Sequence, residues 1–288
     1  MAIHLLVALL ALALLHLWPR LASRRGDELF RRWVRQLNDT SGAGRVLLAL
    51  LPPVALCVLI VVLLGRGVSG ALLEPLFALI VLVYCFGPRD FEADVEAILN
   101  APDGVSREVA AQKLADDGER VAWSARALGS ATVYAALRRR FAVLLWFFLL
   151  GPTGALAYRL AQTLARDAGL QRDNDTTAAR YFANAADWVP AQLLTFTLAL
   201  VGHWEAVIAA WRGWHSQAQT TSWYRSGPDF LGAAARANVQ SDIEGGDGYS
   251  QEHSDPVVEL VRLRSTLLRA LLAWLSVVAL IVIGGWMR

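Results

Sequence analysis

The sequence predicts an all-α protein, a polytopic membrane helix bundle with interrupted or re-entrant helices and cytoplasmic amphipathic helices. Hydrophobic residues make up 56% of the 288 residues, and the mean hydropathy is +0.40. This composition is too apolar for a soluble globular protein. No stretch shows the alternation of apolar and polar residues that is typical of a strand. We therefore expect residues 1–288 to form a single membrane domain that contacts the lipid bilayer.

Four apolar stretches are expected to cross the membrane as helices. They cover residues 3–18, 46–64, 70–86 and 267–286. The first is short, because a span needs about 20 residues at about 1.5 Å each. It does not have the pattern of a secretion signal, since arginines follow the apolar run instead of preceding it. We expect it to be retained, and we expect Pro52 and Pro53 to kink the second span.

The orientation follows from an arginine-rich segment between the first two spans. Residues 20–45 contain seven Arg against three acidic residues. Because basic loops stay in the cytoplasm, this segment predicts an amino terminus on the outer side of the membrane, which would be the periplasm if the membrane is a bacterial inner membrane. Residues 65–69 would then be periplasmic as well. Residues 87–140 would begin in the cytoplasm, where their three- and four-residue apolar spacing predicts helices interrupted near residues 101–104.

Two further apolar stretches, residues 141–160 and 186–210, contain helix-breaking residues. Gly151, Pro152 and Gly154 interrupt the first, and Pro190 interrupts the second. A broken helix inside a bilayer persists only against other protein or a wet cavity, so such breaks often mark sites. Both stretches can span, or both can dip in and return. We favour the second alternative, because only ten apolar residues precede the break at Gly151.

Several remaining features limit the kinds of partner that we expect. Residues 240–256 are polar and glycine-rich, which predicts a mobile loop. Cys57 and Cys85 lie in apolar runs and are expected to be small buried hydrophobes, not a disulfide. The 27 basic and 25 acidic residues nearly cancel, so no nucleic-acid partner is expected. The oligomeric state does not follow from the sequence.

A set of polar residues beside the two interrupted stretches is the candidate ligand-binding site. It contains Arg159, Arg180, Asn184, Asp187, His203 and Glu205. Arg180, Asn184 and Asp187 share one helical face, which suits either recognition of a planar anion or a structural Arg–Asp pair. His203 and Glu205 are two residues apart and do not share a face, so we favour an interfacial role over catalysis.

Common catalytic and metal-binding motifs are missing from the sequence. It contains no Walker A sequence, no nucleophile elbow and no His-Glu-x-x-His helix. Residues 173–176 (DNDT) resemble the start of a calcium loop but lack its Gly at the sixth position and its Glu at the twelfth. We therefore expect no catalytic residue, no metal site and no cofactor.

Four short segments resemble the AmpE family, inner-membrane regulatory proteins associated with β-lactamase induction. The segments are residues 150–160 (LGPTGALAYRL), residues 186–193 (ADWVPAQL), Gly202-His203 with Glu205, and Trp211-Arg212. The resemblance extends over most of the chain. It implies a regulatory signalling protein linked to β-lactamase induction and peptidoglycan recycling, with an unknown small ligand or protein partner in that recycling.

The AmpE family is in turn similar to the CobD/CbiB proteins, membrane enzymes of cobalamin biosynthesis that use ATP to join cobyric acid to an aminopropanol moiety. That branch carries Glu-Asn and a following Asp where this chain has residues 134–138 (YAALR). It carries Asn-Thr-Leu-Asp-Ser at residues 162–166 (QTLAR), and an Arg at Gln192. Acids that would hold Mg²⁺ and nucleotide are therefore missing. We expect a non-enzymatic regulator, with an ATP-dependent amide-forming synthase or a small-molecule transporter as alternatives.

Overall fold

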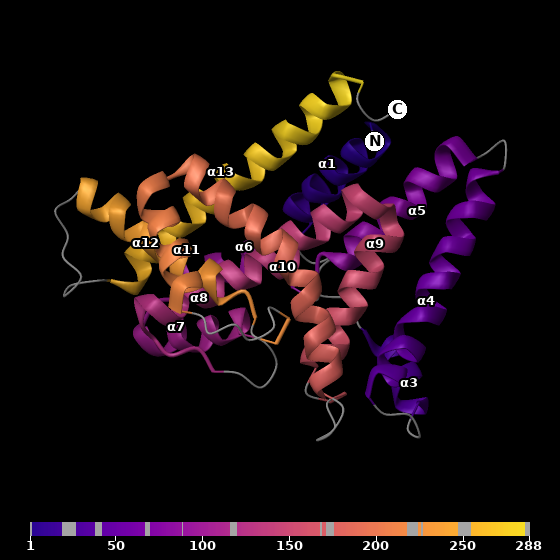
Figure 1. Cartoon of the computed structure of the whole chain (residues 1–288), viewed down its shortest axis with the longest axis horizontal. Coiled ribbons are helices and arrows are strands. Elements are labelled where there is room, and N and C mark those ends of the chain that lie inside the picture. Colours follow the sequence, from indigo (N-terminus) through magenta and orange to yellow (C-terminus); the bar gives the residue numbers. More distant parts are fainter. Residues whose placement is uncertain are drawn as a thin grey trace. The chain divides into compact units, whose positions relative to one another are not determined.

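The computed structural model confirms the all-α prediction (Figure 1). It describes residues 2–18, 27–37, 42–66, 70–87, 89–115, 120–167, 169–170, 176–217, 224–225, 227–246 and 255–285. Within these ranges, every regular element is helical. Two predicted segments lie partly outside them. These are the turn at residues 65–69, of which 67–69 are not described, and the mobile loop at residues 240–256, of which 247–254 are not described.

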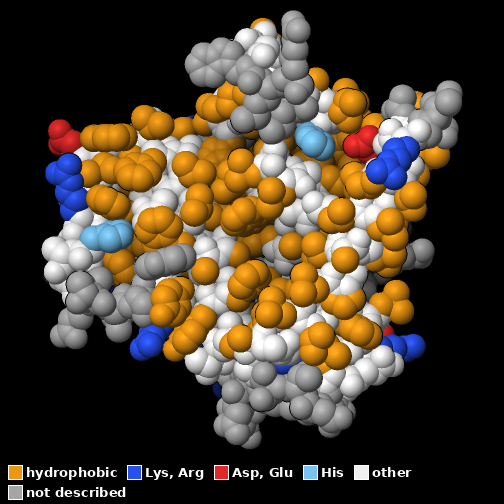
Figure 2. Space-filling view, turned by 45° about the vertical axis from the view of Figure 1, so that its right-hand side comes forward, with side chains coloured by type: hydrophobic (Ala, Val, Ile, Leu, Met, Phe, Trp, Pro, Cys, Tyr) orange, Lys and Arg blue, Asp and Glu red, His pale blue; other side chains and the backbone are white. Residues whose placement is uncertain are grey.

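Three helical regions are long and apolar enough to cross a membrane. They are α4 (Gly42–Gly65), the gapless helical run Ala125–Arg166 and α13 (Pro256–Ile283). Two shorter apolar helices are α1 (Ala2–Leu17) and α5 (Gly70–Cys85). Only 17% of the most apolar stretch of α4 and 22% of that of α13 are buried inside the protein. Most side chains of these stretches are therefore available to contact lipid. Figure 2 shows a face covered mainly by hydrophobic side chains, with charged side chains near its margins.

The chain divides into two compact units, and the first contains residues 1–90, 142–183 and 278–288. In it, α5 packs against α1, α4 and α9 (Ala142–Arg166), and α4 also packs against α9. The short helix α3 (Glu28–Gln36) contributes Phe30 and Val34 to a core shared with α4 and α9. The core therefore joins an amphipathic helix to the apolar helices.

The second unit contains residues 91–141 and 184–277. Its elements are α6 (Phe91–Leu99), α7 (Gly104–Ala111), η1 (Gln112–Leu114), α8 (Ala125–Ala136), the π-helical turn η2 (Leu137–Phe141), most of α10 (Thr176–Val201), α11 (Trp204–Gln217), α12 (Asp229–Gly246) and most of α13. Helix α12 packs against α11 and α8. Residues 100–103 separate α6 from α7, where the sequence predicts an interruption near residues 101–104, and Asp103 caps α7 by accepting the Ser106 N–H at 2.8 Å.

One of the two predicted interruptions differs from the observed helices. Helix α9 is broken at Gly151, as expected, whereas α10 continues through Pro190 and ends at Val201. The second break therefore lies at Gly202-His203, before α11. The location of these helices in a bilayer, and their orientation, stay predictions.

The predicted mobile loop at residues 240–256 is helical over its first seven residues, because α12 extends to Gly246. Tertiary contacts outweigh the polar, glycine-rich composition here. Ile243 is buried, and Asp242 accepts a hydrogen bond from Arg262 of α13 at 2.9 Å. Cys57 and Cys85 are free thiols and are buried, in agreement with the composition argument.

Candidate functional site

The break in α9 depends on a conformation that only glycine adopts readily. Gly151 has φ 67° and ψ −158°, a region essentially closed to residues with a Cβ. Pro152 follows and has no N–H, so the carbonyl of Phe148 loses its helical donor. A different carbonyl at the break, that of Leu150, accepts a hydrogen bond from the Thr153 hydroxyl at 2.7 Å. Glycine and proline together thus divide α9 into two half-helices.

A second glycine allows the chain to turn back closely after the break. A Cβ at Gly154 would lie 2.5 Å from both the Leu150 Cβ and the Trp146 carbonyl oxygen. Atoms cannot approach so closely, and backbone cannot move aside as a flexible side chain can. Gly154 is therefore needed for packing rather than for backbone conformation.

His4 of α1 lies against this break, and the sequence did not single it out. Its Nε2 lies 3.6 Å from the position that a Cβ would take at Gly151, and its ring meets the Phe147 ring edge-on with centroids 5.2 Å apart. The His4 Nδ1 is buried and has no hydrogen-bond partner among the described residues. His4 could have been identified from the sequence, because it is an ionisable residue inside an apolar helix.

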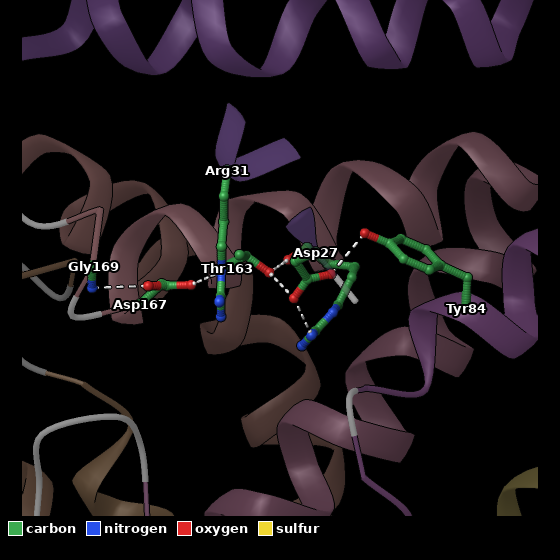
Figure 3. Close-up of polar contacts among 7 residues, drawn as sticks. Asp27, Arg31, Tyr84, Thr163, Asp167 and Gly169 are labelled. Atoms are coloured by element: carbon green, nitrogen blue, oxygen red, sulfur yellow. Dashed lines mark hydrogen bonds and ion pairs between the residues drawn. The ribbon is translucent and has the colours of Figure 1, made fainter. Parts of the chain in front are cut away.

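Arg159, a predicted site residue, belongs to a buried polar cluster around Asp27 (Figure 3). Its Nη2 donates to Asp27 Oδ2 at 2.8 Å, and the Tyr84 hydroxyl donates to Asp27 Oδ1 at 2.7 Å. The Thr163 hydroxyl lies 3.4 Å from Oδ2. We call Asp27, Tyr84, Arg159 and Thr163 the Asp27 cluster. It joins the start of α3 to α5 and α9, so Arg159 has a structural partner that the sequence did not predict.

A second ion pair lies next to the Asp27 cluster. Arg31 Nε is 2.6 Å from Asp167 Oδ2, and Asp167 Oδ1 accepts the backbone N–H of Gly169 at 2.9 Å. The Asp167 side chain is only 7% exposed, so its charge is neutralised within the protein. Figure 3 shows Arg31 beside Asp167, the residue that follows α9, and Asp27 beside Thr163 of α9.

Asp187 is fully buried and pairs with Arg138 of η2. Arg138 Nε lies 3.3 Å from Asp187 Oδ2, and the guanidinium also lies over the Tyr134 ring at 5.5 Å. The Tyr134 hydroxyl donates to Asp229 Oδ1 at 3.4 Å. Partial burial raises the pKa of Asp229, against the opposing effects of Tyr134 and Arg138. The π-helical turn that carries Arg138 is an irregularity often found at functional sites.

Asn184 and Arg180 have different environments on α10. The Asn184 side-chain amide donates to the carbonyl oxygens of Tyr224 at 3.4 Å and Arg225 at 3.3 Å. Arg180 is exposed near the start of the helix. Asp187 thus has an arginine of η2 as a partner, which replaces the Arg180–Asp187 pair considered from the helical spacing.

His203 and Glu205 lie at the second break. The His203 backbone N–H donates to Asn238 Oδ1 at 2.8 Å, and its Nε2 lies 3.6 Å from Asp242 Oδ1. Glu205 is exposed in the first turn of α11, where its negative charge interacts favourably with the positive end of the helix dipole. These contacts stabilise the chain at the second break and link it to α12. A function for His203 beyond this structural role stays a prediction.

The six candidate residues fall in both units. Arg159 and Arg180 belong to the first unit, and Asn184, Asp187, His203 and Glu205 belong to the second. Their assembly into one ligand site stays a prediction. Among the described residues, no group of three or more His, Cys, Asp or Glu side chains is arranged to hold a metal ion.

Comparison with known proteins gives one partial similarity. A cobalamin biosynthesis protein CobD from Chromobacterium violaceum is 35% identical over 112 residues, which cover 38% of this chain and 34% of that protein. The aligned region thus spans about a third of the relative's length. No protein-family model matches the chain. No solved structure matches it either. Together with the apolar helices, the similarity indicates a membrane protein related in part to CobD.

Proposed function

We propose that this chain is a non-enzymatic regulatory protein of the bacterial inner membrane, of the AmpE type. Its implied role is in signalling linked to β-lactamase induction and peptidoglycan recycling. The observation that carries this proposal is the ion pair between Arg138 and the buried Asp187. Arg138 occupies the segment where the resemblance expects the acids of the synthase branch.

The chemistry at this position disfavours ATP-dependent synthesis. A magnesium nucleotide site needs free carboxylates that hold the metal against the phosphates. Here a guanidinium takes that place, and the nearby Asp187 carboxylate accepts a hydrogen bond from it. Tyr134, at the first position of the same segment, donates to Asp229. These groups make helix-to-helix contacts inside the second unit.

The other segment that departs from the synthase pattern also makes internal contacts. Gln162 Nε2 lies 3.4 Å from the Ala183 carbonyl oxygen of α10, and Arg166 Nε donates to Gln162 Oε1 at 2.8 Å. The synthase branch would carry an Asp between these positions, where this chain has Ala165. Ala165 has no side-chain oxygen that could bind a metal ion, and Gln162 uses its amide to link α9 to α10. Both residues therefore fit a structural role better than metal binding.

The test measures induced β-lactamase activity in a bacterial host that lacks its own copy of the regulator. The wild-type chain should restore normal induction. Arg159→Ala, Asp187→Asn and His203→Ala should abolish that output if the candidate residues form the functional site. Arg126→Ala, a change at an exposed residue of α8, is the matched control and should leave induction normal. Normal induction from all three site variants, at wild-type protein levels, would contradict the site.

The similarity to CobD favours one alternative, an amide-forming synthase of the cobalamin pathway. The proposed regulator should show no Mg²⁺-dependent ATP turnover with cobyric acid, and it should not rescue a strain that lacks the cobalamin enzyme. Rescue at the wild-type level would replace the regulatory proposal with the synthase.

A further inference from the structure

Helix α3 has one face packed into the protein and another that faces outward. Phe30 and Val34 are buried in the core that α3 shares with α4 and α9. On the opposite face, Leu29 is 82% exposed and the Arg32 side chain is 70% exposed. Arg35 is exposed as well. The outer face of α3, which we define as Leu29, Arg32 and Arg35, thus combines an apolar side chain with two cations.

The charges at the inner side of α3 are neutralised within the first unit. Asp27 belongs to the Asp27 cluster, and Arg31 pairs with Asp167. These contacts fix the position of α3 in the first unit, so its outer face has a defined orientation there. Arg32 also contacts Glu28 at 3.2 Å, but both side chains are exposed, and an exposed pair four residues apart contributes little to stability. A stronger anion can therefore compete for Arg32.

The position of α3 places its outer face near the start of a candidate span. In Figure 1, α3 lies at the end of α4 where that helix begins, and their shared core confirms the contact. Leu47, Leu48 and Leu51 are exposed in the first turns of α4. An exposed leucine beside arginines, next to the first apolar turns of a span, is the arrangement of a helix that lies in a membrane interface.

We propose that the outer face of α3 binds the headgroups of anionic phospholipids. The guanidinium groups of Arg32 and Arg35 suit phosphate oxygens, and Leu29 would enter the headgroup region beside them. The charge of the surrounding sequence complements such lipids, because residues 20–45 contain seven Arg and three acidic residues. Each arginine near an anionic surface raises the affinity roughly fivefold.

The experiment measures lipid adducts on the purified full chain by native mass spectrometry, with phosphatidylglycerol and phosphatidylethanolamine as probes. The variant Arg32→Gln/Arg35→Gln keeps helix-forming side chains and removes both charges. It should bind phosphatidylglycerol roughly tenfold or more weakly, with phosphatidylethanolamine binding unchanged. Arg120→Gln/Arg126→Gln removes two other exposed arginines and is the matched control, which should retain wild-type binding.

Three outcomes would overturn this proposal. The first is undiminished phosphatidylglycerol binding by the α3 variant. The second is an equal loss in the control, which would assign the effect to net charge. The third is competition by soluble glycerol phosphate as effective as that by the lipid, which would make the ligand a free anion. An unchanged melting temperature shows that the variant is folded, and β-lactamase induction is not used, so failure here is separate from failure of the regulatory proposal.

Discussion

The two interrupted apolar stretches contain similar residues and behave differently. In α9, the pair Gly151-Pro152 breaks the helix, and Gly151 has φ 67°. In α10, Pro190 lies inside a helix that continues to Val201. The second break occurs at Gly202, where a Cβ would clash with the side-chain amide of Asn238. Both real breaks therefore coincide with a glycine, and the isolated proline produces none.

The difference shows which property of these residues interrupts a helix. Proline removes one hydrogen bond and disfavours the helical conformation of the preceding residue, but neighbouring packing can absorb both effects. Pro190 is buried, and one turn earlier Asp187 is held by Arg138. A glycine that adopts positive φ instead changes the direction of the chain. We infer that tertiary contacts keep α10 continuous and that Gly151 makes the break in α9.

The largest expected effect comes from removing the contact that secures α10 beside Pro190. Asp187→Ala leaves the Arg138 guanidinium without a buried carboxylate, which should lower the free energy of unfolding by about 3–5 kcal/mol. Thermal melting in detergent and the amount of protein in the membrane measure the loss. Arg180→Ala, at an exposed position of the same helix, should change stability by about 0.5 kcal/mol or less. An equal cost for both variants would contradict the assigned pairing.

The next effect tests the glycine that makes the first break. Gly151→Ala should destabilise the protein by about 1–3 kcal/mol, because alanine strains the observed backbone conformation. The new Cβ would meet only ordinary contact, 3.6 Å from His4 Nε2, so the cost is conformational. Gly213→Ala in α11, where a Cβ meets nothing within 4 Å, is the control and should be neutral or slightly stabilising. A neutral Gly151→Ala variant, measured by thermal melting, would mean that the break persists without glycine.

The sequence was sufficient to predict the fold class and the break at Gly151. Apolar composition and helical spacing are local properties, and a Gly-Pro pair carries its own backbone restriction. The same reasoning overestimated Pro190 and expected a loop at residues 240–246, because it could not include the packing of Ile243 or the contact between Asp242 and Arg262. Local rules gave way to tertiary contacts in both places.

The partners of the candidate site residues could not be predicted from spacing along one helix. Arg159 and Asp27 are separated by 132 residues, and Arg138 and Asp187 by 49. Such pairs depend on which helices become neighbours, which a single sequence does not specify. Spacing did place Arg180, Asn184 and Asp187 on one face, yet the structure gives Asp187 a partner from another helix.

A smaller effect is expected at Pro190, and it sharpens the contrast with Gly151. Pro190→Ala restores an N–H that can donate to the Ala186 carbonyl, while the buried position loses some proline contacts. These changes oppose each other, so the free energy of unfolding should shift by about 1 kcal/mol or less. Thermal melting of this variant beside Gly151→Ala provides the comparison. A loss as large as that of Gly151→Ala would show that proline itself shapes α10.

The smallest expected effect is a pH dependence at the second break, where Asp242 lies beside His203 and Arg262. The hydrogen bond from Arg262 holds the pKa of Asp242 below its ordinary value of 3.8, against the opposing effect of burial. A lowered folded-state pKa gives stability that is present above the ordinary value and is lost as the pH falls through the folded value. Because the side chain is 39% exposed, solvent screening limits the contribution to less than about 1 kcal/mol.

Melting temperatures of the wild type and Asp242→Asn, measured from neutral pH to below pH ~3, test this contribution. The wild type should be slightly more stable at neutral pH, and the difference should disappear at the acid end as Asp242 becomes protonated. Glu244→Gln, a change at an exposed carboxylate of the same helix, is the matched control. A difference between wild type and Asp242→Asn that stays constant across the range would mean that the Arg262 contact does not depend on the charge of Asp242. The helix α12 would then be held at the Gly202 break by packing and by Asn238 rather than by this ion pair.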